Sequence, residues 1–576
     1  MPCHSKNIPD SAGAAIHDTE QCRCASRKRL QVCTGSPLDS VTLHNFAFPP
    51  GFMCYPNPEM NVMRTPCVLL LLVAFAVPSG ASVTFNKDIA PLVHQNCTSC
   101  HRPGQSGPFP LITYRDVKKR ALTIEEVLID RYMPPWKPVN DNIHYANDRK
   151  LSEQEIDLVS NWVEAGTPEG DPGSAPEPPN YPSGWYLGKP DLVLKMQGTF
   201  EIPAEGRDIY RSFVFPLQLP EDKWVKAVEL RPKAKSAVHH ALFFIDSNGA
   251  ARKLDGRDGK AGISGMGFLR QAGGITDPAA AFGGGNGGLG GHVPGATPAK
   301  LPGDLAMFLP KGSDVIMQTH FHPSGKKEVE EAELALYFAK KAPEVNLVPI
   351  QIPPFFGATK AINIPAGEQN YVVEDSITLP VPVKAVSVGG HAHYICRTMS
   401  MNATLPDGRK ITLMNIDDWD LDWQDRYQFK EPLDLPAGTV LKTRLVYDNS
   451  ASNPENPNSP PRRITWGQES DDEMGSVTLI VVPEDNSKIQ TIANAQRNQL
   501  ISGAAQAIQQ ARKTMLNVKN YDDNKDGLVQ YEEVPGRMRS RIFSRFDTNK
   551  NKVLEQEEQV AVQKYLDSFL GGFRRR

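Results

Sequence analysis

The sequence predicts a multidomain protein in which two β-sandwiches lie between two small α-helical domains. A chain of 576 residues is too long for one domain and suggests three or four. From about residue 190 to 485, short apolar runs alternate with Pro, Gly and Asn turns, which is typical of sandwich strands. Helical patterns occur before and after this region, and residues 171–190 form a Pro- and Gly-rich linker.

Charge and composition exclude some classes of partner. The formal net charge of -3 argues against a nucleic-acid partner and against a strongly membrane-seeking protein. The 49 prolines and 45 glycines favour strands joined by turns over helical bundles.

An export signal is predicted at residues 60–81. A basic start at Met63-Arg64 precedes an apolar run and then small residues up to Ala81. The run is too short to span a bilayer, so we expect an exported, periplasmic or secreted protein with no stable membrane span. Residues 1–59 are interpreted as a disordered, non-native extension from an upstream start; a pro-segment is the alternative. Cys396 is expected to be a buried free thiol.

Residues 82–170 carry the attachment motif for haem c, Cys97-Thr-Ser-Cys100-His101. The two thiols bind the porphyrin, and the histidine becomes the proximal iron ligand. A zinc half-site is the weaker reading because no second CxxC follows. Met133, on a Pro-rich loop after a helical stretch at residues 116–130, is the expected sixth ligand. His144 is the alternative, and a further helix is expected at residues 152–165.

Seven histidines lie between His239 and His393, and six of them form close pairs. Imidazole is the commonest transition-metal ligand, so the pairs predict a metal centre. His391 and His393 share one face of a strand and can bind one ion. His239 and His240 would point to opposite faces of a regular strand, so both reach one ion only at a bulge or a strand end, or by using different ring nitrogens.

Copper fits this set of ligands best. Few cysteines or clustered carboxylates accompany the pairs, which disfavours zinc and hard ions. A thioether suits Cu(I), and Met474, just before an apolar strand, is the candidate; by composition alone it is also an ordinary core residue.

Four ordered motifs resemble the copper type II, ascorbate-dependent monooxygenases, which include peptidylglycine α-hydroxylating monooxygenase and dopamine β-monooxygenase. The motifs are Val238-His239-His240, Gln318-Thr-His320-Phe, His391-Ala-His393 and Ser470-Asp-Asp-Glu-Met474-Gly. The resemblance implies two jelly-roll-like copper sandwiches, expected at residues 191–345 and 346–485. The implied ligands of an electron-transfer copper are His239, His240 and His320. The implied ligands of the copper that activates O2 are His391, His393 and Met474.

Three departures from the family pattern limit what the resemblance implies. Gly389 stands where the peptide-amidating enzyme has a substrate-binding arginine, and Ser476 and Thr478 replace its asparagine and tyrosine. A glycine-extended peptide substrate is therefore doubtful. The family's disulfides are absent, and His322 has no counterpart. The glycine-rich run Gly262–Gly291 is expected to be a mobile loop near the first copper.

The C-terminal region predicts a helical linker at residues 486–516 and an EF-hand pair at residues 517–576. The first loop fits the EF-hand pattern, with ligands expected from Asp522, Asn524, Asp526, the carbonyl of Leu528 and Glu533. The second loop offers Asp547, Asn549, Asn551 and Glu558. Lys552 occupies its turn-glycine position, and fewer charges should lower its Ca2+ affinity.

The leading hypothesis is an exported copper monooxygenase that hydroxylates a C–H bond of an organic substrate with O2. Electrons would enter through the fused haem c from an ascorbate-like reductant or a redox protein, and the implied cofactors are two copper ions, haem c and Ca2+. A non-catalytic copper and haem electron-transfer protein is the alternative. A haem peroxidase is disfavoured, because a sixth iron ligand would close the site that peroxidases need open.

Overall fold

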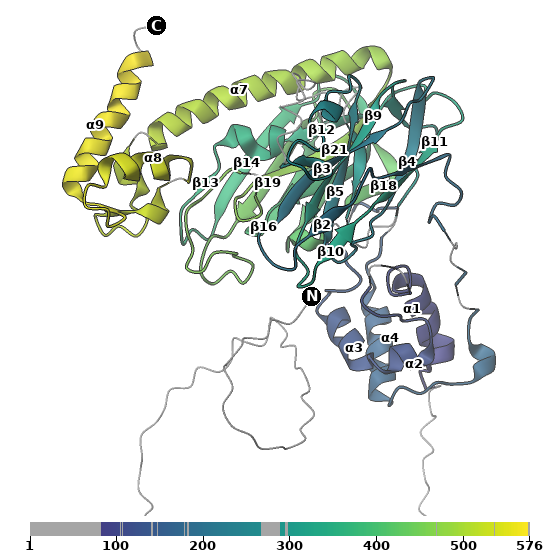
Figure 1. Ribbon diagram of the computed structural model, residues 1–576. Coiled ribbons are helices and arrows are strands. Elements are labelled where there is room, and N and C mark those ends of the chain that lie inside the picture. Colours follow the sequence, from purple (N-terminus) through teal and green to yellow (C-terminus); the bar gives the residue numbers. More distant parts are fainter. Residues whose placement is uncertain are drawn as a thin grey trace, which may run out of the picture.

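The computed structural model describes residues 82–103, 105, 107–139, 142–146, 148–177, 179–180, 184–265, 288–293, 298–467, 469–515, 517–534 and 536–573. The predicted extension at residues 1–59 and the predicted signal at residues 60–81 lie outside the described residues. The protein is multidomain, with two sandwich-like pairs of sheets and helices near both ends of the described chain (Figure 1).

An N-terminal helical unit comes first. Its helices are η1 (Phe85–Ile89), α1 (Ala90–Asn96), α2 (Tyr114–Lys118), α3 (Ala121–Ile129), α4 (Glu153–Glu164) and the short turn η2 (Pro172–Ser174). Helix α4 begins at a capping box, in which the Ser152 hydroxyl accepts from the Glu155 amide and the Glu155 carboxylate accepts from the Ser152 amide. Such a cap stabilises a helix by about 1 kcal/mol. The helical stretch expected at residues 116–130 is present as two helices, α2 and α3, with a break at Arg120.

The first sandwich packs a five-stranded sheet on a four-stranded sheet. The larger sheet has the order β6 (Ile263–Ser264), β3 (Ile209–Pro216), β9 (Asp314–Phe321), β5 (Val238–Asp246) and β7 (Gly288–His292). The smaller sheet has the order β1 (Leu192–Lys195), β11 (Glu333–Phe338), β4 (Lys223–Arg231) and β8 (Met307–Leu309). Strands β2 (Phe200–Ile202) and β10 (Glu328–Glu330) form a separate pair, and η3 spans Ala251–Lys253.

Strand β9 is buried along its whole length. Val315 and Met317 enter the core between the two sheets. Ile316, on the other face, packs against Phe244 in a second apolar cluster. Because side chains alternate along a strand, His320 shares this outer face with Ile316.

The glycine-rich run Gly262–Gly291 is expected to be a mobile loop, and for most of the run this stays a prediction. Its ends form β6 and β7, whereas residues 266–287 lie outside the described residues. A Cβ at Gly291 would lie 3.0 Å from the carbonyl oxygen of Ala241, so the close pairing of β7 with β5 requires glycine there.

The second sandwich pairs two four-stranded sheets. One has the order β12 (Val348–Ile352), β21 (Gly475–Pro483), β15 (Val383–Ala392) and β18 (Arg426–Leu435). The other has the order β14 (Tyr371–Thr378), β19 (Val440–Tyr447), β16 (Cys396–Thr404) and β17 (Lys410–Ile416). The remaining elements are β13 (Asn363–Ile364), β20 (Ile464–Thr465), η4 (Pro354–Lys360) and η5 (Leu421–Trp423). Cys396 is fully buried in this core as a free thiol, as expected.

A long helix, α7 (Ile489–Met515), runs along the second sandwich to a C-terminal helical unit (Figure 1). That unit contains η7 (Val518–Tyr521), β22 (Val529–Gln530), η8 (Tyr531–Glu533), α8 (Gly536–Phe546), β23 (Val553–Leu554) and α9 (Gln556–Phe573); η6 (Asn486–Lys488) precedes α7. The two helical units lie on different sides of the sheets (Figure 1).

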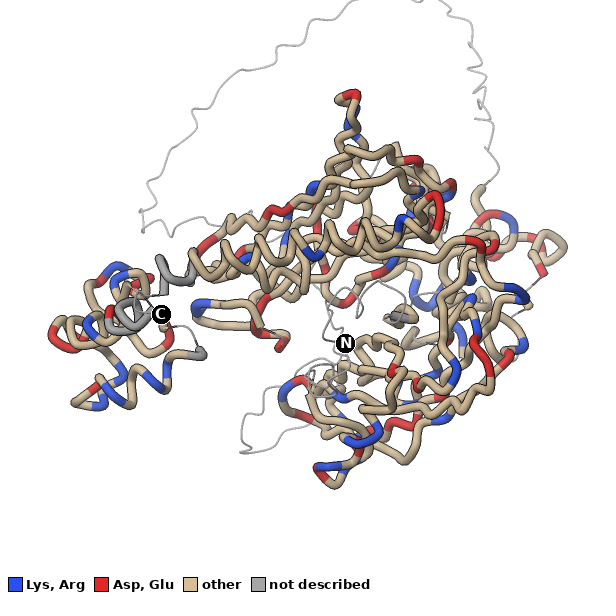
Figure 2. Tube along the Cα trace, turned by 90° about the horizontal axis from the view of Figure 1, so that it is seen from above, with Lys and Arg blue, Asp and Glu red and all other residues tan. Residues whose placement is uncertain are grey.

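Charged residues of both signs are interspersed along the described chain (Figure 2). Among the helices of the described residues, none combines the length and the apolar character needed to cross a membrane.

Candidate metal centre

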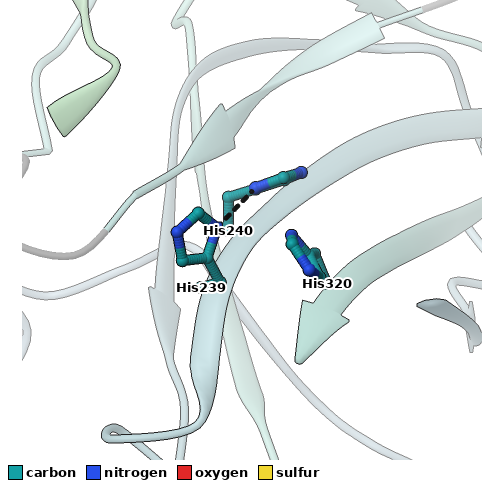
Figure 3. Close-up of side chains that lie close together, drawn as sticks. All are labelled: His239, His240 and His320. Atoms are coloured by element: carbon teal, nitrogen blue, oxygen red, sulfur yellow. Dashed lines mark hydrogen bonds between the residues drawn. The ribbon is translucent and has the colours of Figure 1, made fainter. Parts of the chain in front are cut away.

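Two adjacent strands bring together the first group of histidines, which we call the first site: His239, His240 and His320. His240 on β5 pairs in register with His320 on β9. The register shifts between Val238 and His240, so β5 carries a bulge at this point. The bulge lets neighbouring histidines face the same side, as the sequence required. Figure 3 shows the three rings turned toward one another.

The first site has the geometry of a metal site with three nitrogen ligands. One ring nitrogen from each histidine lies within 4.8 Å of the others. The Nδ1 atoms of His239 and His240 are 3.2 Å apart. The Nδ1 atom of His320 is buried and has no hydrogen-bond partner among the described residues. A metal ion would satisfy this nitrogen, which is otherwise costly to bury.

Carboxylates hold the opposite ring nitrogens. Nε2 of His239 lies 2.8 Å from Asp422, and Nε2 of His320 lies 2.8 Å from Asp208. A carboxylate that accepts from Nε2–H fixes the proton there and leaves the Nδ1 lone pair for a metal. Asp208 also contacts Nδ1 of His322 at 2.8 Å. Burial alone would raise the pKa of Asp208, but its hydrogen bonds with these histidines hold that pKa well below its ordinary value.

The predicted second site, on the second sandwich, comprises His391, His393 and Met474. His391 is on β15, and Ala392 pairs with Gly475 of β21, so His393 and Met474 follow the same pair of strands. The rings of His391 and His393 are 5.5 Å apart. Nδ1 of His391 donates to Gln424 (2.7 Å), and Nδ1 of His393 donates to the carbonyl of Asp472 (3.2 Å). Both histidines therefore keep Nε2 for a metal, the reverse of the first site.

A buried carboxylate orders the backbone of the second site. Oε1 of Glu473 accepts from the amides of His393 (2.7 Å) and Met474 (2.9 Å). Glu473 is fully buried, and burial raises its pKa to about 8. Met474 is itself buried, so its thioether lies away from bulk solvent.

The two sites face each other across the junction of the sandwiches. The rings of His240 and His391 are 6.1 Å apart. Ser470, from the second sandwich, donates to Asp208 and lies 3.2 Å from the hydroxyl of Tyr210. The Tyr210 ring stacks on His320 with centroids 4.3 Å apart. Each sandwich therefore contributes to the surroundings of the other sandwich's histidines.

Burial keeps these imidazoles neutral. It lowers the pKa of His320 to about 4 and that of His393 to about 3, and it lowers the pKa of His240 well below its ordinary value. Neutral imidazole is the form that binds metals, so no proton has to leave these three side chains at neutral pH.

The CxxCH motif has an arrangement that fits haem c. Cys97, Cys100 and His101 lie on one turn, in which the His101 amide donates to the Cys97 carbonyl at 2.9 Å. Neither Cys97 nor Cys100 forms a disulfide in the described part of the chain. Nδ1 of His101 lies 3.1 Å from the carbonyl of Phe109, which leaves Nε2 for iron. Met133 is half-buried and His144 is exposed; the assignment of the sixth ligand stays a prediction.

Two loops of the C-terminal unit repeat one hydrogen-bonding pattern. In the first loop, Asp522 accepts from the amides of Asp526 and Gly527, while Asn524 accepts from Asp526 and Glu533 from Asp523. The Leu528 amide donates to Asp526. Turns built this way gather oxygens around a common centre, as Ca2+ requires.

The second loop repeats these contacts. Asp547 accepts from the amides of Asn551 and Lys552, Asn549 accepts from Asn551, and Glu558 accepts from Thr548. Lys552 adopts a left-handed backbone with φ +64°, at the position where the first loop has Gly527 at +85°. Strands β22 and β23 pair the two loops.

The residues that orient the histidines were not predicted: Asp208, Asp422, Gln424, Ser470 and Glu473. Only Ser470 and Glu473 lay inside a recognised motif, and neither had been given a role. The others are separated from their histidines by 33 to 183 positions along the chain. No spacing rule could have linked them.

Comparisons with known proteins do not identify a family for this chain, so the functional assignment depends on the geometry described above. No protein-family model matches the chain, and no curated protein matches it. Similar solved structures include PNGase F, a glycosylasparaginase from Flavobacterium meningosepticum, with a TM-score of 0.24, 9% identity and coverage of 51% of this chain and 97% of that chain. Another is the major capsid protein P2 of bacteriophage PM2, with a TM-score of 0.19, 9% identity and coverage of 50% and 96%. Likenesses this low carry no argument about the chain.

Proposed function

We propose that the chain is an exported copper-dependent monooxygenase that hydroxylates a C–H bond of an organic substrate with O2. The observation that carries the proposal is the pair of facing ligand sets, with rings of His240 and His391 6.1 Å apart. Three imidazoles on one sandwich, and two imidazoles with a thioether candidate on the other, are nitrogen- and sulfur-rich sets that suit copper.

Copper at the two sites would cycle between Cu(I) and Cu(II), supplying the electrons that O2 needs. The protein's own contribution is to hold the ligands. Asp208 and Asp422 keep the protons of His320 and His239 on Nε2, and Glu473 ties the backbones of His393 and Met474 together. We assign the role of O2 activation to the second site, because Met474 supplies a soft ligand for Cu(I).

We include haem c and Ca2+ in the proposal. Cys97, Cys100 and His101 would hold the haem, with Met133 as the proposed sixth ligand. The first C-terminal loop would be the stronger Ca2+ site and the second the weaker one. The resemblance to the copper type II monooxygenases and the exported location belong to this same proposal.

Metal analysis and oxygen uptake test the proposal together. We expect two copper ions and one haem per chain, and O2 consumption that depends on both a reductant and an organic substrate. Met474→Leu should abolish the uptake while the haem is retained. Met401→Leu is the matched control, because Met401 is an equally buried methionine on β16, outside either site.

Fewer than two copper ions per wild-type chain would overturn the proposal. A chain that binds both coppers and haem, yet takes up no O2 with a broad panel of substrates, would instead be the electron-transfer protein of the alternative hypothesis. Equal loss of uptake in Met474→Leu and Met401→Leu would assign the effect to packing and remove Met474 from the second site.

A further inference from the structure

One segment of the N-terminal helical unit binds the second sandwich through hydrogen bonds and ion pairs. We call residues 131–139, 142–146 and 148–150 the docking segment. Its backbone bonds to two strands: the Val139 amide donates to Asn415 at 2.9 Å, and the Ala146 amide donates to Gln428 at 2.8 Å. The buried Tyr145 donates its hydroxyl to the Leu413 carbonyl at 2.9 Å. These contacts hold the predicted haem unit in one orientation on the sandwich.

Ion pairs reinforce this docking. Arg149 pairs with Asp425 at 2.9 Å, and Lys137 pairs with Asp418 and Asp420 at 3.3 and 3.6 Å. The three carboxylates lie immediately before and after the short helix η5, Leu421–Trp423. The docking segment therefore reaches the part of the second sandwich that also orients the metal ligands.

An aromatic pair lies at the centre of this contact. The ring of Tyr132, next to Met133, meets the ring of Trp423 edge to face with centroids 6.1 Å apart. The indole Nε1 of Trp423 is buried and, among the described residues, has no hydrogen-bond partner. A buried indole usually bonds through its N–H, so a hydrogen bond does not explain why a tryptophan occupies position 423.

The neighbours of Trp423 each touch one site. Asp422 bonds to Nε2 of His239 in the first site at 2.8 Å. Gln424 accepts from Nδ1 of His391 in the second site at 2.7 Å. Three consecutive residues therefore contact the docking segment and both candidate copper sites.

A second contact brings the CxxCH turn toward the first sandwich. Burial, and then the charges of Arg231 and Arg102, lower the pKa of Lys235. Arg102 follows His101 directly, and Lys235 lies four residues before His239. Arg102, beside the CxxCH turn, is therefore close enough for its charge to act on Lys235, in the chain that enters β5.

We propose that Tyr132 and Trp423 form the electron route from the haem to the copper centre. The inference rests on the proposed function. In each transfer one electron leaves ferrous haem, which becomes ferric, and reduces one Cu(II) to Cu(I); no bond is made or broken. An external small-molecule reductant of the ascorbate class then returns the haem to the ferrous state. Asp422, the chain neighbour of Trp423 that bonds to His239, connects it to the first site. Gln424, the other neighbour, bonds to His391 and connects it to the second site.

Rapid reduction of the haem tests this route without turnover. In the full-length protein loaded with haem and Cu(II), the haem is reduced by a photoexcited flavin under anaerobic conditions. Its reoxidation is followed by absorbance, and the loss of the Cu(II) signal is followed by electron paramagnetic resonance. Haem content, copper content and both reduction potentials are measured for every variant, because a structural defect would change these quantities.

We expect Trp423→Leu and Tyr132→Leu each to slow haem reoxidation by at least about tenfold. The double variant should be no slower than the slower single variant, because the two rings act in series. Trp423→Phe should restore most of the rate. Trp224→Leu is the matched control, because Trp224 packs on Phe308 on the opposite sheet of the first sandwich and should leave the rate unchanged.

The experiment distinguishes failure of the proposed function from failure of the electron route. Wild-type protein that binds no haem or fewer than two copper ions would overturn the proposed function and the route with it. Fully loaded Trp423→Leu and Tyr132→Leu proteins with wild-type rates would overturn the route alone. Slower transfer accompanied by shifted potentials in Trp423→Leu, with an unaffected Tyr132→Leu, would make Trp423 a structural residue and also overturn the route.

Discussion

Replacing Arg463 by methionine should release the C-terminal helical unit from the second sandwich. The Arg463 side chain is 3% exposed and pairs with Asp523, which is 6% exposed. The guanidinium also donates to the carbonyls of Glu533 (2.9 Å) and Asn520 (3.0 Å). Removing one partner of a buried ion pair costs about 3–5 kcal/mol, because the other charge is left unpaired. The ratio of docked to released unit should therefore fall by about 10²–10⁴-fold.

Hydrogen–deuterium exchange measures this loss, and residues 517–534 should exchange faster in Arg463→Met. A second substitution, Asp523→Asn, removes the unpaired charge and should restore part of the protection. The control is Arg462→Met, because Arg462 pairs with Asp471 within the second sandwich instead of with the C-terminal unit. Unchanged exchange in Arg463→Met would refute the reasoning and show that other contacts, such as the Ala366 amide bonded to Asp523, hold the unit in place.

Three further predictions concern the loops and the metal sites. Lys552→Gly should raise the free energy of unfolding of the C-terminal unit by about 1 kcal/mol in calorimetry, since a lysine in the left-handed region is strained; an unchanged value would contradict this. Glu473→Ala should cost about 2–4 kcal/mol by leaving two buried amides unpaired and should lower copper content, whereas Glu473→Gln keeps the acceptor; equal effects of the two variants would count against it. In metal-free protein, His320 is neutral above pH 6.5 in both the folded and the unfolded state. In the folded state, burial lowers the pKa of His320 to about 4. The contribution of His320 to stability should therefore fall by up to about 3 kcal/mol as pH drops from 6.5 to 4. His320→Gln should remove this share in denaturant titrations, while the shares of His240 and His393 remain.

The strands could be predicted because their signals are local. Short apolar runs between turns located β5, β9 and β15, and a bulge, one of the arrangements expected for the adjacent His239 and His240, is present in β5. The pairing of Gly288–His292 with β5 depends on contacts distant in sequence. A glycine-rich strand has little propensity of its own, so only its neighbour β5 shows that it is a strand.

The residues that orient the histidines could not be predicted, because each is distant in sequence from the histidine that it contacts. His239 belongs to the first sandwich, but Asp422, which bonds its Nε2, belongs to the second. Gln424 and Trp423 carry no motif, and their importance becomes visible only when the two sandwiches and the docking segment are together.

The hydrogen bonds of Asp208 and Asp422 mean that the first sandwich, expressed as a separate fragment, would not reproduce the metal site of the whole protein. Ser470 of the second sandwich donates to Asp208, and Asp422 of the second sandwich bonds to His239. A first sandwich expressed on its own would retain all three histidines but lose both of these contacts. Without Asp422 the His239 imidazole would be free to rotate and to exchange tautomers, while Asp208 would still bond to His320 but lose the Ser470 hydroxyl. An affinity measured on that fragment would therefore describe a different binding site from the one in the whole protein.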